Sequence, residues 1–285
     1  MDLAGFELVT LKSGTKSLRS KERGETFHSV TGPWLEANRL HVAQQRLAER
    51  CLMRQGRPFV VWDVGFGAAA NALAAIAALR AVPGARVDLH SFDITRASAD
   101  FALANAAELD YLAGYERALE ELLATGEARV EGIHWRLHLG DFTIQVRDCD
   151  SRAPHAILYD PYSAATNPEM WTLGHFEALF ARLDPEEPCL WTNYTRASPV
   201  RAALLLAGFH VGTGTTVGGA DAGGDKETTI ASNRLELLEA PLGARWLERV
   251  RKSNGAAPLR QARYTQSPMS DEDFARIAAL PQFNS

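Results

Sequence analysis

The sequence lacks the features of a secreted, membrane-spanning or disulfide-bonded protein. Its 285 residues include only three cysteines, Cys51, Cys149 and Cys189, which are widely spaced and form no Cys-x-x-Cys pair. This usage predicts packed thiols in a reducing compartment. The start has no basic n-region, and no apolar run is long enough to cross a bilayer. We therefore expect a soluble, cytoplasmic protein without a membrane partner.

Metal-ligand clusters and serine-hydrolase motifs are also missing. His134 and His138 could share one face of a strand, but no third ligand accompanies them at a suitable spacing. A tetrahedral site needs three or four protein ligands, so no metal site is predicted. The sequence contains no Gly-x-Ser-x-Gly motif, and no Ser–His–acid arrangement is readable.

Positive charge is scarce overall and gathered in two places. The formal net charge is −5, which argues against indiscriminate nucleic-acid binding. Residues 12–23 nevertheless hold five cations against one acid, in a Gly/Ser/Thr-rich frame that predicts a hairpin. Residues 245–263 hold six cations against one acid. Each segment is either a solvated face or a surface that follows phosphates.

Strand-like and helix-like segments alternate along the chain, and a 46% hydrophobic composition allows one large domain with small additions. This alternation predicts an α/β fold with a mostly parallel sheet. We expect strands at residues 59–64, 87–92, 134–139, 156–159 and 189–194, and helices at 68–80, within 97–124, at 175–183 and at 199–207.

The end of this pattern distinguishes between α/β classes. Two further strands, 209–214 and 227–232, are separated by a glycine-rich stretch and no helix. This predicts an antiparallel closing strand on a seven-stranded sheet, similar to the Rossmann-like class I S-adenosylmethionine-dependent methyltransferases. We expect three parts: a hairpin with a helix at 35–51 in residues 1–55, the core in 56–240, and a small helical tail in 241–285 with a helix at 271–280.

The stretch from Val60 to Asn71 predicts a nucleotide-type cofactor. An apolar run ends near Asp63, turns through Gly65 and Gly67, and continues into an alanine-rich helix. Glycine allows a ligand to lie against the backbone, beside the unpaired N–H groups of the helix start. The dinucleotide fingerprint is met only in its looser form. Asp63 could orient the amino-acid part of a cofactor, directly or through water.

Two more acids follow the ends of predicted strands. Asp93 ends the second strand and could accept both ribose hydroxyls of an adenosine, or could cap the next helix. Gly140-Asp141 follows the third strand, where the carboxylate could accept from an adenine amino group, or the pair could form a common turn.

The most specific motif lies in residues 156–171. It reads Asp-Pro-Tyr-Ser from Asp160, then Asn-Pro-x-Met-Trp from Asn167. This resembles the signature of the MnmC-like methyltransferases, which act on 5-aminomethyl-2-thiouridine at the wobble position of tRNA. Residues 24–29 with Gly32 and Glu36 are similar to an earlier motif of that family, and residues 65–67 with Asn71 to its cofactor loop. Ala69 departs from the glycine usual in that loop.

The resemblance implies S-adenosyl-L-methionine as cofactor and the anticodon loop of tRNA as partner, with an upstream tRNA-modifying enzyme to supply the aminomethyl group. It covers about residues 8–250 and includes no flavin oxidase domain, so we expect a stand-alone methyltransferase. Catalytic residues would be Asp160 and Tyr162. The cofactor-binding residues would be Phe27, His28, Glu36, Asp63, Gly65, Gly67, Asn71, Asp93, Gly140, Asp141 and Asp160.

The residue chemistry fits such a reaction. Methyl transfer to an amine needs aligned atoms and a free nitrogen lone pair. Asp160 could accept the released proton, and Tyr162 could stack on a uracil ring. Alternatively, Asp160-Pro161 is an ordinary turn after a strand. Tyr194 could close the pocket or be structural, and Met170 and Trp171 are expected in the core.

Two other functions remain open from the sequence. One is an aminopropyltransferase resembling spermidine synthase, against which the Asn-Pro-x-Met-Trp motif argues. The other is a catalytically silent RNA-binding scaffold that keeps the fold.

Overall fold

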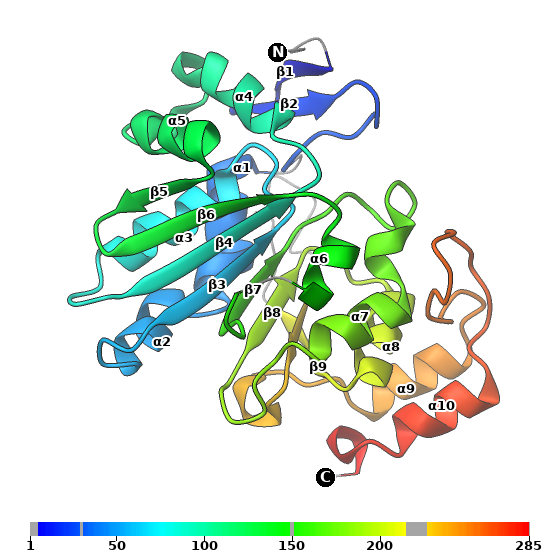
Figure 1. Cartoon of the computed structure of the whole chain (residues 1–285). Helices are drawn as coiled ribbons and strands as arrows, with labels where there is room; N and C mark the ends of the chain where they lie inside the picture. The colour runs from blue at the N-terminus through cyan, green and yellow to red at the C-terminus, as the bar shows by residue number, and fades with distance from the viewer. Residues whose placement is uncertain (1–4, 29–30, 149–150, 215–226, 285) are drawn as a thin grey trace.

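A computed structural model describes residues 5–28, 31–148, 151–214 and 227–284 of the chain. Its centre is one eight-stranded sheet with helices on both faces (Figure 1). The strand order is β5-β6-β4-β3-β7-β8-β10-β9. The strands are β3 Phe59–Val64, β4 Val87–Asp93, β5 Glu127–Val130, β6 Ile133–Leu139, β7 Ala156–Tyr159, β8 Leu190–Asn193, β9 His210–Gly214 and β10 Thr228–Ser232.

The predicted parallel core and its antiparallel closing strand are confirmed. Strands β6, β4, β3, β7 and β8 run parallel, and β10 pairs antiparallel with both β8 and β9. The glycine-rich stretch at 217–225 lies outside the described residues. The sheet has one strand more than the predicted seven, because β5 adds an antiparallel edge strand to β6. This strand is only four residues long, and it directly follows a helix, so no separate strand pattern marks it in the sequence.

The central strand β3 is buried on both faces, which explains its uninterrupted apolar run. Val61 packs into a core beneath helices α3 Ala70–Arg80 and α5 Glu116–Thr125. Trp62 packs into a second core beneath α7 Leu173–Phe180 and α8 Ser198–Ala207. The sheet therefore lies between two helical layers and holds β3 in the middle of the molecule.

Two predicted helices prove to be interrupted. Residues 35–51 form α1 Pro33–Ala37, a π-helical turn η1 Asn38–Ala43 and α2 Leu47–Met53. Gln45 is buried at the break, where its amide donates to the Ile157 carbonyl at 2.9 Å and to Thr192 Oγ1 at 2.7 Å. Contacts with the sheet thus override the helical periodicity, which a local sequence pattern does not reveal.

The prediction of one long helix within 97–124 is likewise wrong. The segment consists of α4 Ala97–Ala104, the 3₁₀ turns η2 Ala106–Glu108 and η3 Asp110–Leu112, and then α5. Gly114, at a φ of +83°, provides the turn before α5. The remaining short elements are α6 Phe142–Asp148, η4 Pro168–Trp171, η6 Leu235–Leu237, α9 Ala244–Arg251, α10 Asp271–Ala278 and η7 Pro281–Phe283.

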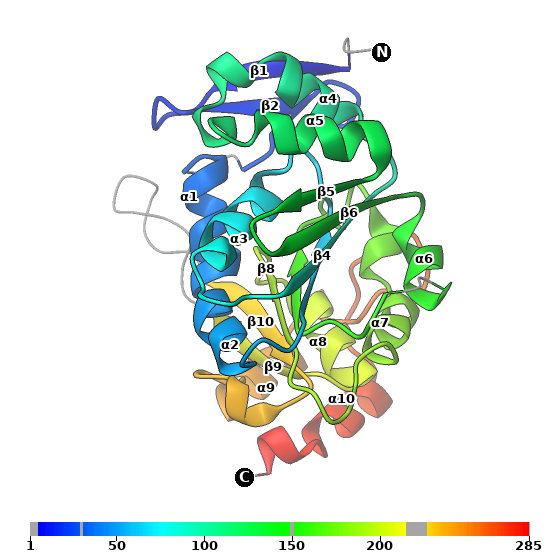
Figure 2. The same cartoon turned by 60° about the vertical axis from the view of Figure 1, so that its left-hand side comes forward.

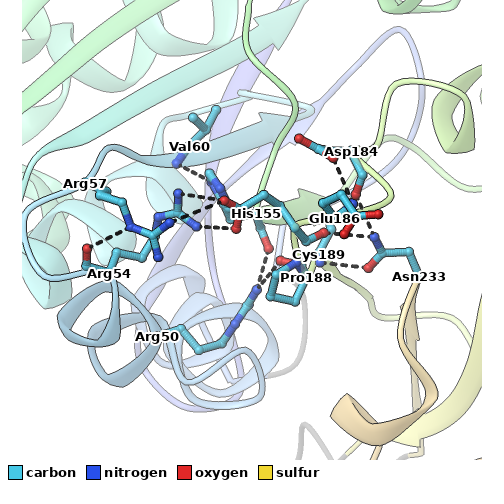
Figure 3. A network of polar contacts seen from close by, with 11 residues as sticks. Arg50, Arg54, Arg57, Val60, His155, Asp184, Glu186, Pro188, Cys189 and Asn233 are labelled. Atoms are coloured by element: carbon cyan, nitrogen blue, oxygen red, sulfur yellow. Dashed lines mark hydrogen bonds and ion pairs between the residues drawn. The ribbon is translucent and has the colours of Figure 1, made fainter.

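A polar network fixes α2 to the amino ends of β7 and β8 (Figure 3). Arg50 donates to the carbonyls of His155 at 2.6 Å and Pro188 at 3.2 Å. His155 Nδ1 accepts from the Val60 N–H at 2.9 Å, and burial lowers the pKa of His155 to about 4. The imidazole is therefore neutral at pH 7 and can accept this bond. The network stabilises the end of the sheet opposite to the ends where the loops after the parallel strands gather.

The predicted amino-terminal hairpin is confirmed as β1 Phe6–Thr10 paired with β2 Lys16–Ser20. It packs beside α4, where the Phe6 and Phe101 ring centroids are 5.9 Å apart. In both views the hairpin lies at the top of the molecule and α9 and α10 lie near the bottom (Figures 1 and 2). The predicted boundaries between 55 and 56 and between 240 and 241 stay predictions.

The described residues include two of the three cysteines and helices too short or too polar to cross a bilayer. Cys51 and Cys189 are free and buried, whereas Cys149 lies outside the described residues. Within the described ranges, no helix is long and apolar enough to span a membrane. No group of three potential metal ligands occurs among the same residues.

Candidate active site

The carboxyl ends of β3, β4, β6 and β7 border a cavity of about 700 Å³. The chain turns or changes direction after each of these strands, so their following loops converge at one edge of the sheet, as in other open α/β folds. Ser20 at the end of β2, several of the residues 22–28 that follow it, and Glu36 on helix α1 contribute to the wall. Several motifs that are distant in the sequence therefore face one space.

The loop after β3 depends on two glycines. Gly65 has a φ of +93°, and a Cβ there would lie 2.5 Å from the Asp160 carbonyl oxygen. Gly67 has a φ of +53°, and a Cβ there would lie 3.3 Å from the Phe27 ring. The glycines allow the loop to pass closely between β7 and the amino-terminal segment. Ala69 also has a left-handed φ of +68°, which costs an alanine about 1 kcal/mol.

Asp93 connects this loop to the end of β4. Its Oδ2 accepts from the Gly67 N–H at 2.9 Å, and its Oδ1 accepts from the Thr95 N–H at 3.2 Å. Burial raises the pKa of Asp93. The carboxylate lines the cavity, and each of its oxygens can accept a further bond. The same side chain thus holds the loop and could accept ribose hydroxyls.

The neighbouring wall offers an apolar surface. Ile94 lines the cavity and is 72% exposed, so its aliphatic side chain is accessible to a ligand there. Gly140 and Asp141 line the same region. Asp141 Oδ1 accepts from the Thr143 N–H at 2.8 Å and the Thr143 hydroxyl at 2.7 Å, so it also begins α6. Ile94 is not among the predicted site residues, although its place directly after the strand-ending Asp93 is a signal for it.

Asp160 lies at the end of β7 in a nearly enclosed position. Its Oδ2 accepts from Asn71 Nδ2 at 2.8 Å and lies 4.0 Å from His28 Nε2. Burial raises the pKa of Asp160 to about 7, and the bond from Asn71 opposes that rise. Burial lowers the pKa of His28, which Glu36 partly offsets. A carboxyl group that titrates near neutrality is suited to exchange protons.

Tyr162 forms an aromatic side of the cavity. Its ring centroid is 5.6 Å from that of Phe27, and the Arg23 guanidinium carbon lies 5.9 Å from it. Burial raises the pKa of Tyr162 to about 12, so its hydroxyl stays protonated. Tyr194 lines the cavity and also donates to the Pro161 carbonyl at 3.1 Å, which combines its two predicted roles.

The predicted core residues of this motif are found where expected. Trp171 is 2% exposed and Met170 is 7% exposed. Trp171 Nε1 donates to the Tyr162 carbonyl at 2.9 Å. The tryptophan therefore holds the backbone of the loop that carries Tyr162.

Two of the predicted cofactor residues lie behind the wall. Asn71 is buried on α3 and reaches the cavity only through its bond to Asp160. Asp63 is fully buried, and its Oδ2 accepts from Ser91 Oγ at 2.8 Å. Ser91 Oγ in turn accepts from Trp135 Nε1 at 3.0 Å. Burial raises the pKa of Asp63 to about 8. Every residue of β3 is buried, so its sequence shows no alternation of polar and apolar residues. The sequence therefore could not show whether the Asp63 carboxyl faces the cavity or lies behind its wall.

The cavity wall is strongly acidic. The described lining residues include seven carboxylates and one arginine, Arg23. The acids are Glu22, Glu25, Glu36, Asp93, Asp141, Asp160 and Glu169. Such a wall attracts a cationic group and repels a phosphate. Glu25 lies in the motif at residues 24–29 but is not among the predicted site residues. It accepts from the Ser163 hydroxyl at 2.7 Å and thereby connects the residues after β2 to the loop after β7.

The two histidines that the sequence places on one strand, His134 and His138 of β6, contact different side chains. His138 Nε2 lies 2.9 Å from His90 Nδ1, and His134 bonds to Glu127 at 2.8 Å. The two rings therefore have different partners.

Comparisons with known proteins agree with this geometry. The profile of a family described as S-adenosyl-L-methionine-dependent methyltransferase matches residues 111–223. The tRNA 5-methylaminomethyl-2-thiouridine biosynthesis bifunctional protein MnmC of Azoarcus sp. (strain BH72) is 32% identical over 214 residues, which cover 69% of this chain and 32% of that protein. Its counterpart in Aeromonas hydrophila is 31% identical over 248 residues, covering 81% of this chain and 36% of that protein. The chain thus spans about a third of the length of these relatives.

A solved structure supports the same assignment over nearly the whole fold. The crystal structure of MNMC2 from Aquifex aeolicus superposes with a TM-score of 0.71 at 25% identity, and the match covers 96% of this chain and 84% of that one. The match extends over the sheet that carries the glycine loop and the strand-end acids. The chain belongs to the S-adenosyl-L-methionine-dependent methyltransferases of the MnmC family and corresponds to the methyltransferase portion of those proteins.

Proposed function

We propose that this chain methylates the 5-aminomethyl group of the wobble uridine, or 2-thiouridine, in tRNA. The acidic cavity is the observation that carries the proposal. Its described wall holds seven carboxylates against one arginine. The methyl donor carries a positive sulfonium, and the aminomethyl group is an ammonium at neutral pH. A cavity with this charge favours both reactants over a neutral or anionic substrate.

The residues present fit S-adenosyl-L-methionine, which supplies an electrophilic methyl group when bound. Asp93 can accept the ribose hydroxyls while it holds Gly67. Ile94 offers an apolar surface to a flat adenine ring, and Asp141 lies beside it on the wall. The backbone of Gly65 and Gly67 leaves room for the rest of the molecule, because neither residue has a side chain. Gly140 lies beside Asp141, whereas Asp63 is buried behind the wall and bonds to Ser91 on β4.

Asp160 is the proposed proton acceptor. An ammonium has no lone pair with which to attack a methyl group, so one N–H proton must leave before the nitrogen attacks. The Asp160 carboxyl has a pKa of about 7, so a large fraction is ionised at neutral pH and can take this proton. Asn71 positions the carboxylate, and His28 lies 4.0 Å from it.

The aromatic side of the cavity would hold the uracil ring. Tyr162 is positioned by the packing of Phe27 and by the bond from Trp171 to its carbonyl. Enzymes that modify a base take it out of the stack and hold it against aromatic side chains. A protonated Tyr162, with its pKa near 12, provides such a surface without adding negative charge.

The phosphates of tRNA would stay outside this cavity, because its carboxylates repel them. The basic hairpin segment borders the cavity through Arg23. The second basic segment begins on α9, near the opposite end of the molecule (Figures 1 and 2). A tRNA in contact with both segments would therefore cross most of the length of the molecule.

Mass spectrometry of tRNA nucleosides tests the proposal. Transfer RNA that carries 5-aminomethyl-2-thiouridine is incubated with the protein and S-adenosyl-L-methionine, and its nucleosides are analysed for the added methyl group. We expect conversion to the methylaminomethyl nucleoside, and little conversion with Asp160→Asn. No conversion by the unaltered protein, although it binds S-adenosyl-L-methionine, would refute the proposed substrate. Product formation from decarboxylated S-adenosylmethionine and a polyamine precursor would instead indicate an aminopropyltransferase.

A further inference from the structure

A second cavity of about 380 Å³ adjoins the first. Ser163 and Tyr194 line both, so the two cavities meet along the loop after β7. The second cavity lies between that loop, the start of α8 and the chain segment 253–266. This segment follows α9 and is drawn in orange to red at the right of Figure 1.

The wall formed by segment 253–266 is anchored to the core. The Leu173 N–H donates to the Leu259 carbonyl at 2.7 Å. The Ala257 N–H donates to the Ser267 carbonyl at 3.0 Å, which closes the segment into a loop. Tyr264 lies within this loop and is 44% exposed, and its hydroxyl accepts from Gln266 Nε2 at 2.7 Å. The aromatic ring is therefore held at the cavity rather than packed into the core.

The chemistry of this wall differs from that of the first cavity. The described lining residues carry no charged side chain. They include aromatic rings, of Trp171, Tyr194 and Tyr264, and the polar side chains of Thr195 and Gln266. A flat, uncharged ring with hydrogen-bonding edges suits such a wall, and a nucleobase is such a ring.

Two exposed arginines adjoin, in the sequence, residues that line the second cavity. Arg196 stands between the lining residues Thr195 and Ala197 and is exposed. Arg263 precedes Tyr264 and is also exposed. Cations beside an uncharged pocket match the two parts of a nucleotide, because the base can enter while its phosphate stays near the arginines.

We infer that the second cavity binds the base of a nucleotide adjacent to the one that is methylated, with Tyr264 as the stacking surface. This inference rests on the proposed function. The two cavities share the wall formed by Ser163 and Tyr194, and this proximity favours a neighbouring nucleotide of the same strand over an independent ligand. When one base of a loop enters the first cavity, the adjacent base is unstacked from it and needs a new surface.

Binding and turnover of two substrates of different length test the inference. One is the free 5-aminomethyl-2-thiouridine nucleoside, and the other is an anticodon stem-loop that carries it. For Tyr264→Ala we expect the stem-loop Kd to rise about five- to tenfold, the lower part of the range for loss of one base stack. The kcat/KM for the nucleoside should stay unchanged. Tyr264→Phe should bind like the unaltered protein, and Tyr264→Leu should resemble alanine if stacking on a flat ring is required.

The readouts separate this inference from the proposed function. Stem-loop binding is measured by fluorescence anisotropy, which does not depend on methylation, and the melting temperature of each variant verifies its folding. Equal stem-loop affinity of Tyr264→Ala and the unaltered protein would overturn the inference even if tRNA is methylated. Selective loss of stem-loop binding without any methylation by the unaltered protein would support the subsite and refute the proposed reaction. An unaltered protein that binds no stem-loop would refute both.

Discussion

Asn71→Ala should shift the pH dependence of methyl transfer without abolishing it. Asn71 Nδ2 donates to Asp160 Oδ2 at 2.8 Å, and this bond holds down a pKa that burial has raised to about 7. A hydrogen bond to a charged group contributes about 1.5 kcal/mol, which corresponds to about one pH unit. The variant's Asp160 should therefore titrate roughly one unit higher, and alanine is well tolerated in the helix that carries position 71.

The direction of the change in rate with pH depends on which form of Asp160 accepts the proton. Only the carboxylate can do so, so activity rises as pH passes through the pKa. A pKa one unit higher leaves about a fivefold smaller carboxylate fraction at pH 7 and almost the same fraction at pH 9. Single-turnover rates of stem-loop methylation from pH 6 to 9.5 should thus show a defect near neutrality that disappears at high pH.

Two control variants complete this experiment. Thr143→Ala removes a comparable bond, of 2.7 Å, from the Asp141 carboxylate and should leave the profile in place. Asp160→Asn should lose about 10²–10⁴-fold in rate and the pH step that belongs to this carboxyl. If Asn71→Ala lowers the rate by the same factor at every pH, Asn71 is only structural. If Asp160→Asn keeps a near-normal rate, proton removal belongs to water or another group.

Three further predictions concern the cofactor loop, the buried acid behind it and the charged surface. Asp93→Ala should weaken S-adenosyl-L-methionine binding about ten- to a hundredfold in calorimetry, since it removes the acceptor for two hydroxyls and the bond to the Gly67 N–H; unchanged affinity would contradict the site. The folded-state pKa of Asp63, about 8, lies above its unfolded value, so the unaltered protein loses stability as pH rises from about 4 to 8. Asp63→Asn should therefore gain stability relative to the unaltered protein over this range, by on the order of 1 kcal/mol per pH unit. Urea unfolding at pH 5 and pH 8 measures the difference in unfolding free energy, and a difference that stays constant would exclude the pKa shift. Alanine at Arg249, Arg251 and Lys252 should raise the KM for tRNA and flatten its salt dependence while cofactor affinity stays constant, and an unchanged salt slope would remove this segment from the tRNA surface.

Local sequence was sufficient where the structure depends on local chemistry. The apolar run of β3 with Gly65 and Gly67 determined a buried strand and a tight loop, because glycine tolerates the positive φ at both positions and the close approach of Gly65 to Asp160. The glycine-rich sequence between the last two strands carries no helical pattern, and this predicted the antiparallel closing pair that β9 and β10 form. The residues after Asp160 identified the family from a short motif.

Tertiary contacts decided what local patterns could not. The helix predicted at 35–51 breaks where Gln45 bonds to the sheet. The helix predicted within 97–124 is interrupted, and Gly114 turns the chain before α5. Hydrophobic periodicity shows which face of a helix is apolar but not where a tertiary contact interrupts it. Asp63 and Asp160 both follow apolar strand residues, yet one is bonded behind the loop and the other lies on the cavity wall. The pKa of Asp160 is about 7 because segments far apart in the sequence bury its carboxyl group. Tertiary packing also brings Tyr264 to the same cavity as the loop after β7. Sequence determines which groups are available, whereas packing determines which of them share a space and how strongly that space excludes water.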